Sequence, residues 1–413
     1  MVKKQAEYPQ NMSGKLFIDS NQIIEKLTRS VLDKSRVAGL THNFYRYPAR
    51  FSPAFASTAI DLFSNPGDIV LDPYMGGGTT IVEALVAGRH AIGTDLNSLS
   101  IFLTKVKTTQ LSVLEKKTLS LWADQLISKI TYRYPSKKIA YLLLEAKKTK
   151  NLSLPRARFI KKYIAAAMDS LDSLQSQNSK DFARCALLKT AQWALDGRKS
   201  HTSITQFREK LKQNLNQMLS DLDEFVSSFG TQGQVNPCRT LIETDAALID
   251  QAIVFSKHSV KVDLVVTSPP YPGLHVLYHR WQVNGRRETP APYWIAGCQD
   301  GQGDSYYNFG SRQQPGLNSY FEKSLHTLKA IRRVIRYGGY VVQMIAFSEP
   351  QTQLPRYLAN MEKAGFKEIL LHNETTSATK DRIWRVVPNR KWHASIQGNT
   401  TGSKEVVLVH IAN

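Results

Sequence analysis

The sequence predicts an α/β protein with a Rossmann-like sheet of seven strands and a mostly helical insertion. Two observations carry this prediction. Short apolar runs of strand length recur towards both ends of the chain, and two of them lead directly into motifs rich in glycine or proline. Between the second and third run, residues 107–235 show almost only helical periodicity. We therefore expect one sheet whose strands are separated in sequence by a helical segment.

Seven segments have the pattern of strands buried in a sheet. They lie at about 69–71, 91–95, 239–243, 262–267, 339–347, 366–373 and 404–411. A helix is predicted near 317–336, and the pair Gly338-Gly339 is expected to open the strand that follows it. These elements divide the chain into a first part of a sheet domain, a basic helical insertion and a second part of the sheet domain, at 1–106, 107–235 and 236–413.

The first strand leads into a glycine-rich turn, which is followed by an apolar helix pattern at 81–86. The turn reads Asp72-Pro73-Tyr74-Met75-Gly76-Gly77-Gly78-Thr79-Thr80. Glycines let a ligand approach the backbone, and the free N–H groups of the helix start favour an anionic or carboxylate group. The next strand ends in Asp95, where nucleotide-binding folds hold ribose hydroxyls. An ordinary strand-to-helix turn is the alternative; a P-loop is disfavoured because no lysine follows the glycines.

The fourth strand ends in Thr267-Ser268-Pro269-Pro270-Tyr271. Two consecutive prolines lack N–H donors and fix φ, so the carbonyls at this strand end are rigid acceptors. The Ser268 hydroxyl, the Pro269 carbonyl and the Tyr271 ring together suit a planar group that bears an amino N–H. The alternative is a rigid turn that only ends a strand.

With these two motifs, the chain resembles the S-adenosylmethionine-dependent amino methyltransferases of DNA, which modify N4 of cytosine or N6 of adenine. The resemblance covers residues from about 42 to 106 and from about 236 to 413. It implies a seven-stranded methyltransferase sheet, S-adenosyl-L-methionine as the cofactor and double-stranded DNA as the partner. Tyr74 and Gly77 depart mildly from the more frequent Phe-x-Gly-x-Gly of the family.

The resemblance also implies roles for individual residues. The segment 42–53 looks like the part of the family that closes over the methionine end of the cofactor, and Thr244-Asp245-Ala246 looks like the acidic turn near the adenine. The cofactor-binding residues implied are Tyr47, Arg50, Phe51, Asp72, Pro73, Gly76, Gly78, Thr79, Thr80, Asp95, Leu96, Asp245 and Ala246. The catalytic residues implied are Ser268, Pro269, Pro270 and Tyr271.

The first residue of the proline motif bears on the target base. In the resembled family, serine there goes mostly with cytosine N4, and aspartate or asparagine mostly with adenine N6, so Ser268 favours cytosine. If Ser268 and the Pro269 carbonyl accept the amino hydrogens, the nitrogen lone pair points at the cofactor methyl, and transfer to a flipped base needs no covalent intermediate. Cys238 resembles the nucleophile of cytosine C5 enzymes, but it precedes a strand and no Glu-Asn-Val segment accompanies it.

The charge of the chain indicates a polyanionic partner. It has 54 Lys+Arg against 34 Asp+Glu, a formal net charge of +20 and a pI of about 9.7. Residues 107–235 hold 22 lysines and arginines against 11 acidic residues. This insertion is our first candidate for target recognition, with basic clusters such as Lys147, Lys148, Lys150, Arg156, Arg158, Lys161 and Lys162.

Two further segments are candidates for target recognition. Residues 272–316 leave the proline motif without clear periodicity and are dense in aromatic and cationic residues, which can fill a gap in a duplex or stack on an extruded base. A folded lid that packs on the sheet is the alternative. Residues 374–403 are third, with Lys380, Arg382, Arg385, Arg390, Lys391 and Trp392. By contrast, the stripe that follows a capping box at Ser203 is predicted to be core, namely Leu211, Leu215, Met218, Leu219 and Leu222.

Composition fits an intracellular enzyme. Cys185, Cys238 and Cys298 show neither pairing nor metal-ligand spacing, so no metal is expected. No apolar signal region follows Met1, and nowhere do eighteen apolar residues run together, so we expect a cytoplasmic protein without a membrane segment. The leading function is site-specific DNA methylation, in a restriction-modification system with a cognate restriction endonuclease. The alternatives are an RNA methyltransferase and a catalytically inactive DNA-binding protein.

Overall fold

The structure of the protein is a computed structural model. It describes the chain apart from residues 1–9, 13–14, 19–20, 36, 48–50, 130–149, 153–154, 199–201, 230–236, 273–280, 284–286, 301–314, 372–381 and 387–403.

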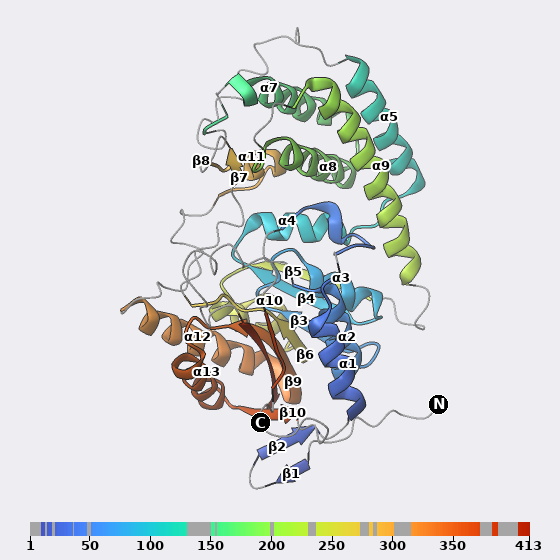
Figure 1. Ribbon diagram of the computed structural model, residues 1–413. Coiled ribbons are helices and arrows are strands. Elements are labelled where there is room, and N and C mark those ends of the chain that lie inside the picture. The colour runs from blue at the N-terminus through green and yellow to red at the C-terminus, as the bar shows by residue number, and fades with distance from the viewer. Residues whose placement is uncertain are drawn as a thin grey trace.

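One mixed sheet organises the described residues (Figure 1). Its path is β1 (Gln10–Met12), β2 (Lys15–Ile18), β10 (Phe366–Leu371), β12 (Lys404–Ala412), β9 (Ile335–Ala346), β6 (Val262–Thr267), β3 (Ile69–Asp72), β4 (His90–Asp95) and β5 (Arg239–Glu243), while β11 (Trp384–Val386) pairs with β12. Strands β9, β6, β3, β4 and β5 are parallel, and β12 runs antiparallel between β9 and β10. All seven expected strands lie side by side, and the Rossmann-like methyltransferase fold is confirmed.

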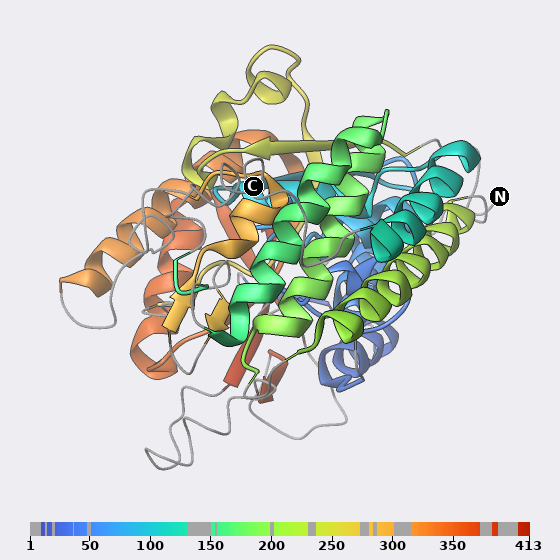
Figure 2. The same cartoon turned by 90° about the horizontal axis from the view of Figure 1, so that it is seen from above.

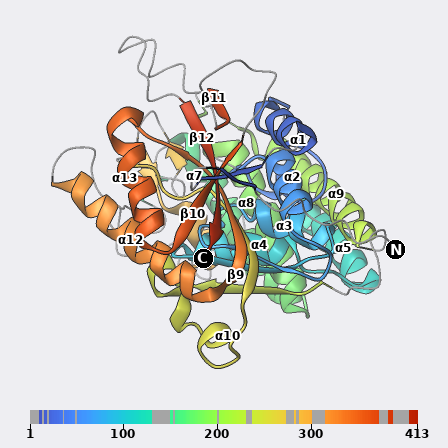
Figure 3. The same ribbon diagram turned by 90° about the horizontal axis from the view of Figure 1, so that it is seen from below.

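Helices cover both faces of this sheet, as Figure 3 shows from below. One face carries α1 (Asn21–Leu32), α2 (Pro53–Phe63) and α3 (Thr79–Val86), and the other carries α10 (Ile253–Ser256), α12 (Gly316–Val334), α13 (Pro350–Lys363) and the 3-10 helix η3 (Ala246–Gln251). Successive strand residues enter opposite cores, so Leu264 packs with the first group and Val265 with the second. Burial on both faces explains the continuous apolar runs in the sequence.

A helical layer lies over one end of the sheet, beyond α4 (Figures 1 and 2). Helix α4 (Ser98–Lys107) packs against the sheet, and the layer beyond it contains α5 (Val113–Lys129), α7 (Pro155–Ser170), η2 (Leu171–Ser173), α8 (Gln177–Leu195) and α9 (Ile204–Ser228). The predicted capping box is present, because Ser203 and Gln206 exchange side-chain and backbone hydrogen bonds. The predicted stripe of α9 is core: Leu211, Leu215, Met218 and Leu222 are buried, and Leu219 packs against them half-buried.

The segment after the proline motif departs from the expected aperiodic loop. Its described part forms a hairpin of β7 (Trp281–Val283) and β8 (Arg287–Thr289), followed by α11 (Ala291–Ala296). The hairpin and α11 pack on α8, so Trp281, Tyr293 and Trp294 are buried in the helical layer and are not available to stack on DNA. Arg287 is exposed on the hairpin. Eight further aromatic or cationic residues of this segment lie outside the described residues: His275, Tyr278, His279, Arg280, Arg286, Tyr306, Tyr307 and Arg312.

The boundary between α12 and β9 also differs from the prediction. The helix ends at Val334, and the strand begins at Ile335 and not at the glycine pair. Gly338 has a φ of +72°, and the pairing of β9 with β6 shifts register between Val262 and Leu264. A glycine bulge inside a strand resembles a strand start in the sequence, because both interrupt the apolar pattern.

Candidate active site

The two sequence motifs meet at one edge of the sheet. The glycine turn follows β3 and the proline turn follows β6, and these strands are direct parallel neighbours, with Leu71 opposite Val265. Strands β4 and β5 end beside them, so Asp95 lies opposite Glu243 and close to the turn that contains Asp245. Ligands of open α/β sheets bind at the carboxyl ends of parallel strands. The motif residues that the sequence separates by about two hundred positions therefore share one site.

Asp72 joins the two motifs. One oxygen of its carboxylate accepts a hydrogen bond from the Thr80 hydroxyl at 2.7 Å, and the other accepts one from the Thr267 hydroxyl at 2.7 Å and one from the Tyr74 N–H at 3.1 Å. The side chain is 3% exposed, and burial raises its pKa to about 6, although these three hydrogen bonds oppose the rise. Asp72 thus holds the residue before Ser268 against the start of α3.

The glycine turn is held in place by its neighbours. The Thr94 hydroxyl donates to the Pro73 carbonyl at 2.9 Å, and the Gly76 N–H donates to Asp95 at 2.9 Å. Behind the turn, the buried Lys107 ammonium donates to the Gly77 carbonyl at 2.6 Å. These three hydrogen bonds fix the shape of the turn.

Gly78 requires glycine for two separate reasons. Its φ is +76°, and a Cβ atom at this position would lie 2.4 Å from Oγ1 of Thr104 on α4. It precedes the first residue of α3, so it sets the direction of the free N–H groups at the helix start. Thr79 and Thr80, the first two helical residues, are buried.

Acidic side chains end the two strands beside the glycine turn. Asp95 accepts from the N–H groups of Gly76 and Asn97, each at 2.9 Å, and burial raises its pKa to about 6. Asp245 caps η3 by accepting from the Ala247 N–H at 2.9 Å. A carboxylate has about four lone-pair sites, so both acids retain capacity for ligand hydroxyl or amino donors. Leu96 is half-buried beside Asp95, and Ala246 is buried at the start of η3.

Tyr47 covers the glycine turn from the N-terminal segment. A Cβ atom added to Gly77 would lie 3.2 Å from Cβ of Tyr47, and one added to Gly76 would lie 3.4 Å from its ring. The Tyr47 hydroxyl lies 2.9 Å from Oγ of Ser100, which in turn interacts with Asp95. Phe51 instead packs edge-on against Phe55 of α2, with ring centroids 5.1 Å apart. Arg50, the remaining predicted residue of this segment, lies outside the described residues.

The carbonyl and hydroxyl groups of the proline turn differ in whether the fold uses them for hydrogen bonds. The Tyr320 hydroxyl of α12 donates to the Pro270 carbonyl at 3.0 Å, so this carbonyl serves the fold. In the part of the chain that the structure describes, no hydrogen bond uses the Pro269 carbonyl. The Ser268 hydroxyl is half-buried and lies 3.3 Å from the Tyr271 hydroxyl, which itself donates to Glu405 on β12 at 2.6 Å. Among the described residues, the Ser268 hydroxyl and the Pro269 carbonyl therefore keep acceptor capacity in this turn.

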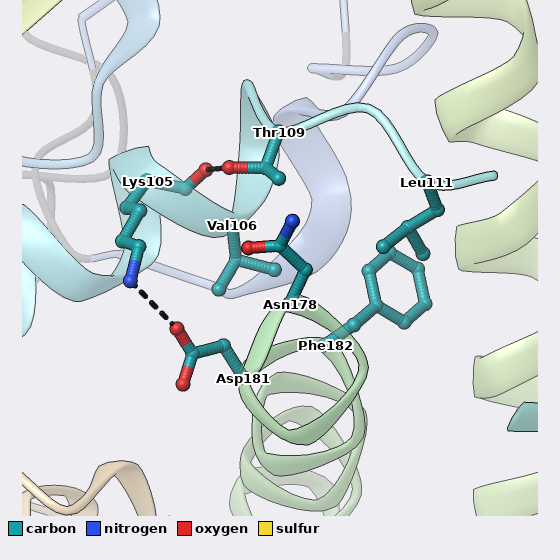
Figure 4. Close-up of a pocket in the computed structure, with 7 residues that line it drawn as sticks. All are labelled: Lys105, Val106, Thr109, Leu111, Asn178, Asp181 and Phe182. Carbon is teal, nitrogen blue, oxygen red and sulfur yellow. Dashed lines mark hydrogen bonds and ion pairs between the residues drawn. The ribbon is translucent and has the colours of Figure 1, made fainter. Parts of the chain in front are cut away.

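A small pocket lies elsewhere, between α4 and the start of α8 (Figure 4). An ion pair of 2.9 Å between the Lys105 ammonium and Asp181 spans it, and Val106 and Phe182 form its apolar wall. None of the residues of the two motifs lines it. We interpret it as a packing gap between the helical layer and α4.

Two arginines that the sequence suggested as DNA contacts, Arg382 and Arg385, form ion pairs within the fold. Arg382 forms two hydrogen bonds with Glu368 on β10, at 2.6 and 2.7 Å, and Arg385 binds Glu405 at 2.6 Å. These two arginines are therefore not free for phosphate. Lys162 is exposed on α7. Of the other basic residues in these candidate clusters, the side chains outside the described residues are Lys147, Lys148, Arg156, Arg158, Lys380, Arg390 and Lys391, together with Trp392.

Cys238 lies far from the two motifs. It immediately precedes β5 and so lies at the amino ends of the parallel strands, whereas the two motifs follow their carboxyl ends. Its sulfur is 3.0 Å from Nδ1 of His90. Among the described residues, no group of three His, Cys, Asp or Glu side chains could hold a metal ion. No helix in the described ranges is long and apolar enough to cross a membrane.

A family model described as DNA methylase matches residues 3–103, which include the glycine turn and Asp95. The type II methyltransferase M.MvaI of Kocuria varians is 36% identical over 98 residues, which cover 21% of this chain and 22% of the relative.

The family match is confined to residues 3–103. The DNA adenine methyltransferase YhdJ of Escherichia coli is 39% identical over 74 residues, which cover 18% of this chain and 25% of the relative. The matches thus span only about a quarter of the length of these relatives or less. The solved structure of TrmN from Thermus thermophilus covers 90% of this chain and 52% of its own, at 12% identity and a TM-score of 0.33, which is too low to add to the topology.

The family implies S-adenosylmethionine as the methyl donor, and the residues at the strand ends fit this group. The absence of Cβ atoms lets Tyr47 and Thr104 pack directly against the backbone of the glycine turn, and Tyr47 closes its outer side. Asp95 and Asp245 retain acceptor capacity at the positions where ribose hydroxyls and an adenine amino group would donate. The names of the two relatives do not distinguish cytosine from adenine as the target base, since one names adenine and the other names no base.

Proposed function

We propose that the protein is a DNA amino methyltransferase that transfers a methyl group from S-adenosylmethionine to the exocyclic N4 of cytosine. The observation that carries this proposal is the link through Asp72. Its carboxylate accepts from Thr80 in the cofactor turn and from Thr267 beside Ser268, so both turns occupy one strand edge in a fixed relation. A site that joins a cofactor cradle to two amino-group acceptors suits direct transfer between two bound molecules.

The proposed mechanism uses the two acceptors of the proline turn. S-adenosylmethionine supplies an electrophilic methyl group on a cationic sulfonium. The Ser268 hydroxyl and the Pro269 carbonyl accept the two hydrogens of the exocyclic amine, which turns the nitrogen lone pair out of the ring plane and towards the cofactor side. The Tyr271 ring holds the face of the flipped base. After transfer, the surplus proton leaves the amine nitrogen towards the Ser268 oxygen and solvent.

Double-stranded DNA is the proposed substrate. The net charge of +20 attracts a polyanion, and an exocyclic amine inside a duplex becomes reachable when the base is flipped. The relative in Kocuria varians is named a type II methyltransferase, which supports a role in restriction-modification beside a cognate restriction endonuclease. The helical insertion, residues 107–235, is the proposed recognition unit.

A second base is supported by one comparison. The relative in Escherichia coli is named a DNA adenine methyltransferase, and its match covers 74 residues. The same two acceptors could hold the N6 amine of adenine. Ser268 is the feature that favours cytosine, and the two alternatives give different products.

Substitution of Ser268 tests this function. Ser268→Ala removes one of the two acceptors and should lower the single-turnover rate of methyl transfer to DNA by about a hundredfold, the usual scale for losing one transition-state contact. Its affinity for S-adenosylmethionine should change less than about twofold, because Asp72 is anchored by Thr267 and not by Ser268.

Ser348→Ala is the matched control. Ser348 follows the neighbouring strand β9, and its hydroxyl contacts Gln353 of α13 and no part of the proline turn. It should retain the wild-type rate. Equal rates for Ser268→Ala and the wild-type protein would sink the proposed role of the proline turn.

A further inference from the structure

We propose that Glu405, held by Arg385, is a positioning residue that fixes the Tyr271 ring in the site. Glu405 and Arg385 both lie outside the glycine motif and the proline motif of the site. The inference rests on the proposed function, because it assigns to Tyr271 the face on which the target base stacks. Its physical basis is a continuous set of contacts from β11 through β12 to the proline turn.

The sheet topology brings Glu405 to the site. Strand β12 runs antiparallel to β9, so its first residues lie beside the last residues of β9, at the edge where the parallel strands end. Glu405 is paired in register with Ala346, the last residue of β9. A residue near the C-terminus of the chain therefore lies beside the proline turn that follows β6.

The same pairing places Arg385 on the other side of Glu405. Strand β11 is antiparallel to β12, and Arg385 lies directly opposite Glu405 in their register. Nε of Arg385 donates to one carboxylate oxygen of Glu405 at 2.6 Å, and the Tyr271 hydroxyl donates to the other at 2.6 Å. The carboxylate thus has one oxygen for the arginine and one for the tyrosine.

Burial makes this arrangement restrictive. Glu405 is 6% exposed and the Arg385 side chain is 11% exposed. A buried carboxylate needs its charge partner and its hydrogen-bond donors, so Glu405 has few orientations available. Hydrogen bonds to charged acceptors are also stronger than those between neutral groups. The Tyr271 hydroxyl therefore has a fixed acceptor before any base enters.

The consequence for the site concerns geometry. A tyrosine ring has two side-chain torsions, and a fixed hydroxyl at one end with a fixed backbone at the other restricts both. The Pro270 carbonyl, bound by Tyr320, fixes the backbone just before Tyr271. The Ser268 hydroxyl lies 3.3 Å from the Tyr271 hydroxyl, so the same tyrosine also limits where Ser268 can turn. Glu405 thus acts on the base through Tyr271 and contacts no reacting atom itself.

The neighbouring pair of Arg382 and Glu368 provides a matched control. It is also an arginine–glutamate pair between the 382–386 segment and a sheet strand, with distances of 2.6 and 2.7 Å. Neither Glu368 hydrogen bond reaches the proline turn. Glu368→Ala and Glu405→Ala therefore remove similar ion pairs, and only the second removes the acceptor of Tyr271.

Single-turnover methyl transfer to DNA and calorimetric titration with S-adenosylmethionine test the inference. Glu405→Ala should lower the transfer rate about 10- to 100-fold, the effect of losing a charged hydrogen-bond acceptor, and leave the cofactor Kd within about twofold of wild type. Tyr271→Phe removes the same hydrogen bond from the other side, so the double variant should be no slower than the slower single variant. Additive losses, or a Glu405→Ala rate equal to that of Glu368→Ala, would overturn the proposal.

Crystal structures of the two alanine variants give a readout that does not depend on activity. The Tyr271 ring should shift or lose order in Glu405→Ala and keep its place in Glu368→Ala. An unmoved ring in Glu405→Ala would overturn the positioning role. If the wild-type protein transferred no methyl group to DNA while the ring still shifted only in Glu405→Ala, the proposed function would fail and the positioning of Tyr271 would stand.

Discussion

Replacing Gly78 by alanine should damage the cofactor turn through two effects that the structure separates. The residue has a φ of +76°, a conformation that costs a residue with a Cβ atom about 1–2 kcal/mol. The added methyl group would also lie 2.4 Å from Oγ1 and 2.8 Å from Cγ2 of Thr104. Relief of such overlap in a packed site costs about 1–3 kcal/mol more. Gly78→Ala should therefore lower the free energy of unfolding by about 2–5 kcal/mol.

Gly88→Ala is the matched control for the backbone effect. Gly88 has nearly the same φ, +75°, but the nearest atom to an added Cβ is Cβ of Pro66 at 3.8 Å, an ordinary contact. This variant should lose only about 1–2 kcal/mol of unfolding free energy. Because Gly88 lies at the other end of α3, its affinity for S-adenosylmethionine should match wild type.

A second-site substitution tests the overlap directly. Oγ1 of Thr104 is buried and has no hydrogen-bond partner among the residues that the structure describes, so Thr104→Ala should strand no donor or acceptor there. Combined with Gly78→Ala, it should recover part of the lost stability and part of the lost cofactor affinity. Chemical denaturation gives the free energies, and calorimetric titration gives the affinities. Equal losses for Gly78→Ala and Gly88→Ala, together with no recovery in the double variant, would refute this reasoning.

Three other substitutions test the role of Asp72 between the two turns and the packing of the hairpin on the helical layer. The pKa of Asp72 is raised from 3.8 to about 6 by burial, so the folded state favours the protonated acid, and the free energy of unfolding should fall by about 3 kcal/mol as pH rises from about 4 to 6. Asp72→Asn can still accept from Thr267 and Tyr74 through its amide oxygen, while its amide nitrogen donates to the Thr80 hydroxyl. It should flatten this part of the profile, measured by denaturation across pH, and an unchanged slope would contradict the assignment. Trp281→Ala removes a side chain that is 1% exposed and donates to the Tyr45 hydroxyl at 2.9 Å, and should cost about 3–5 kcal/mol in thermal unfolding. Arg287→Ala, exposed on the same hairpin, should cost less than about 0.5 kcal/mol.

The sheet could be predicted from the sequence because its strands are short apolar runs, buried on both faces. The seven predicted segments overlap the observed strands, and both motifs lie at strand ends as expected. The N-terminal hairpin of β1 and β2 and the short β11 were not predicted. These strands have three or four residues each, too few for a periodic pattern to stand out.

The parts of the site that sequence reasoning missed depend on pairing between distant strands. Asp72 stays a predicted cofactor-binding residue, but the acceptance of hydrogen bonds from Thr80 and Thr267 by its carboxylate could not be predicted. Glu405 carried one sequence signal, an acidic residue at the start of an apolar strand, but its contact with Tyr271 follows from the antiparallel direction of β12. Trp281 was expected in a loop because a three-residue strand and a six-residue helix show no clear periodicity.

Analysis of methylated nucleosides tests the central claim most directly. The purified protein would be incubated with unmodified bacterial genomic DNA and S-adenosylmethionine, and the digested DNA would be examined by mass spectrometry. N4-methylcytosine, formed about a hundredfold more slowly by Ser268→Ala, is the predicted result. N6-methyladenine would keep the site and contradict the assignment of cytosine, whereas bound cofactor without any methylated nucleoside would contradict the claim that the two turns form a DNA methylation site.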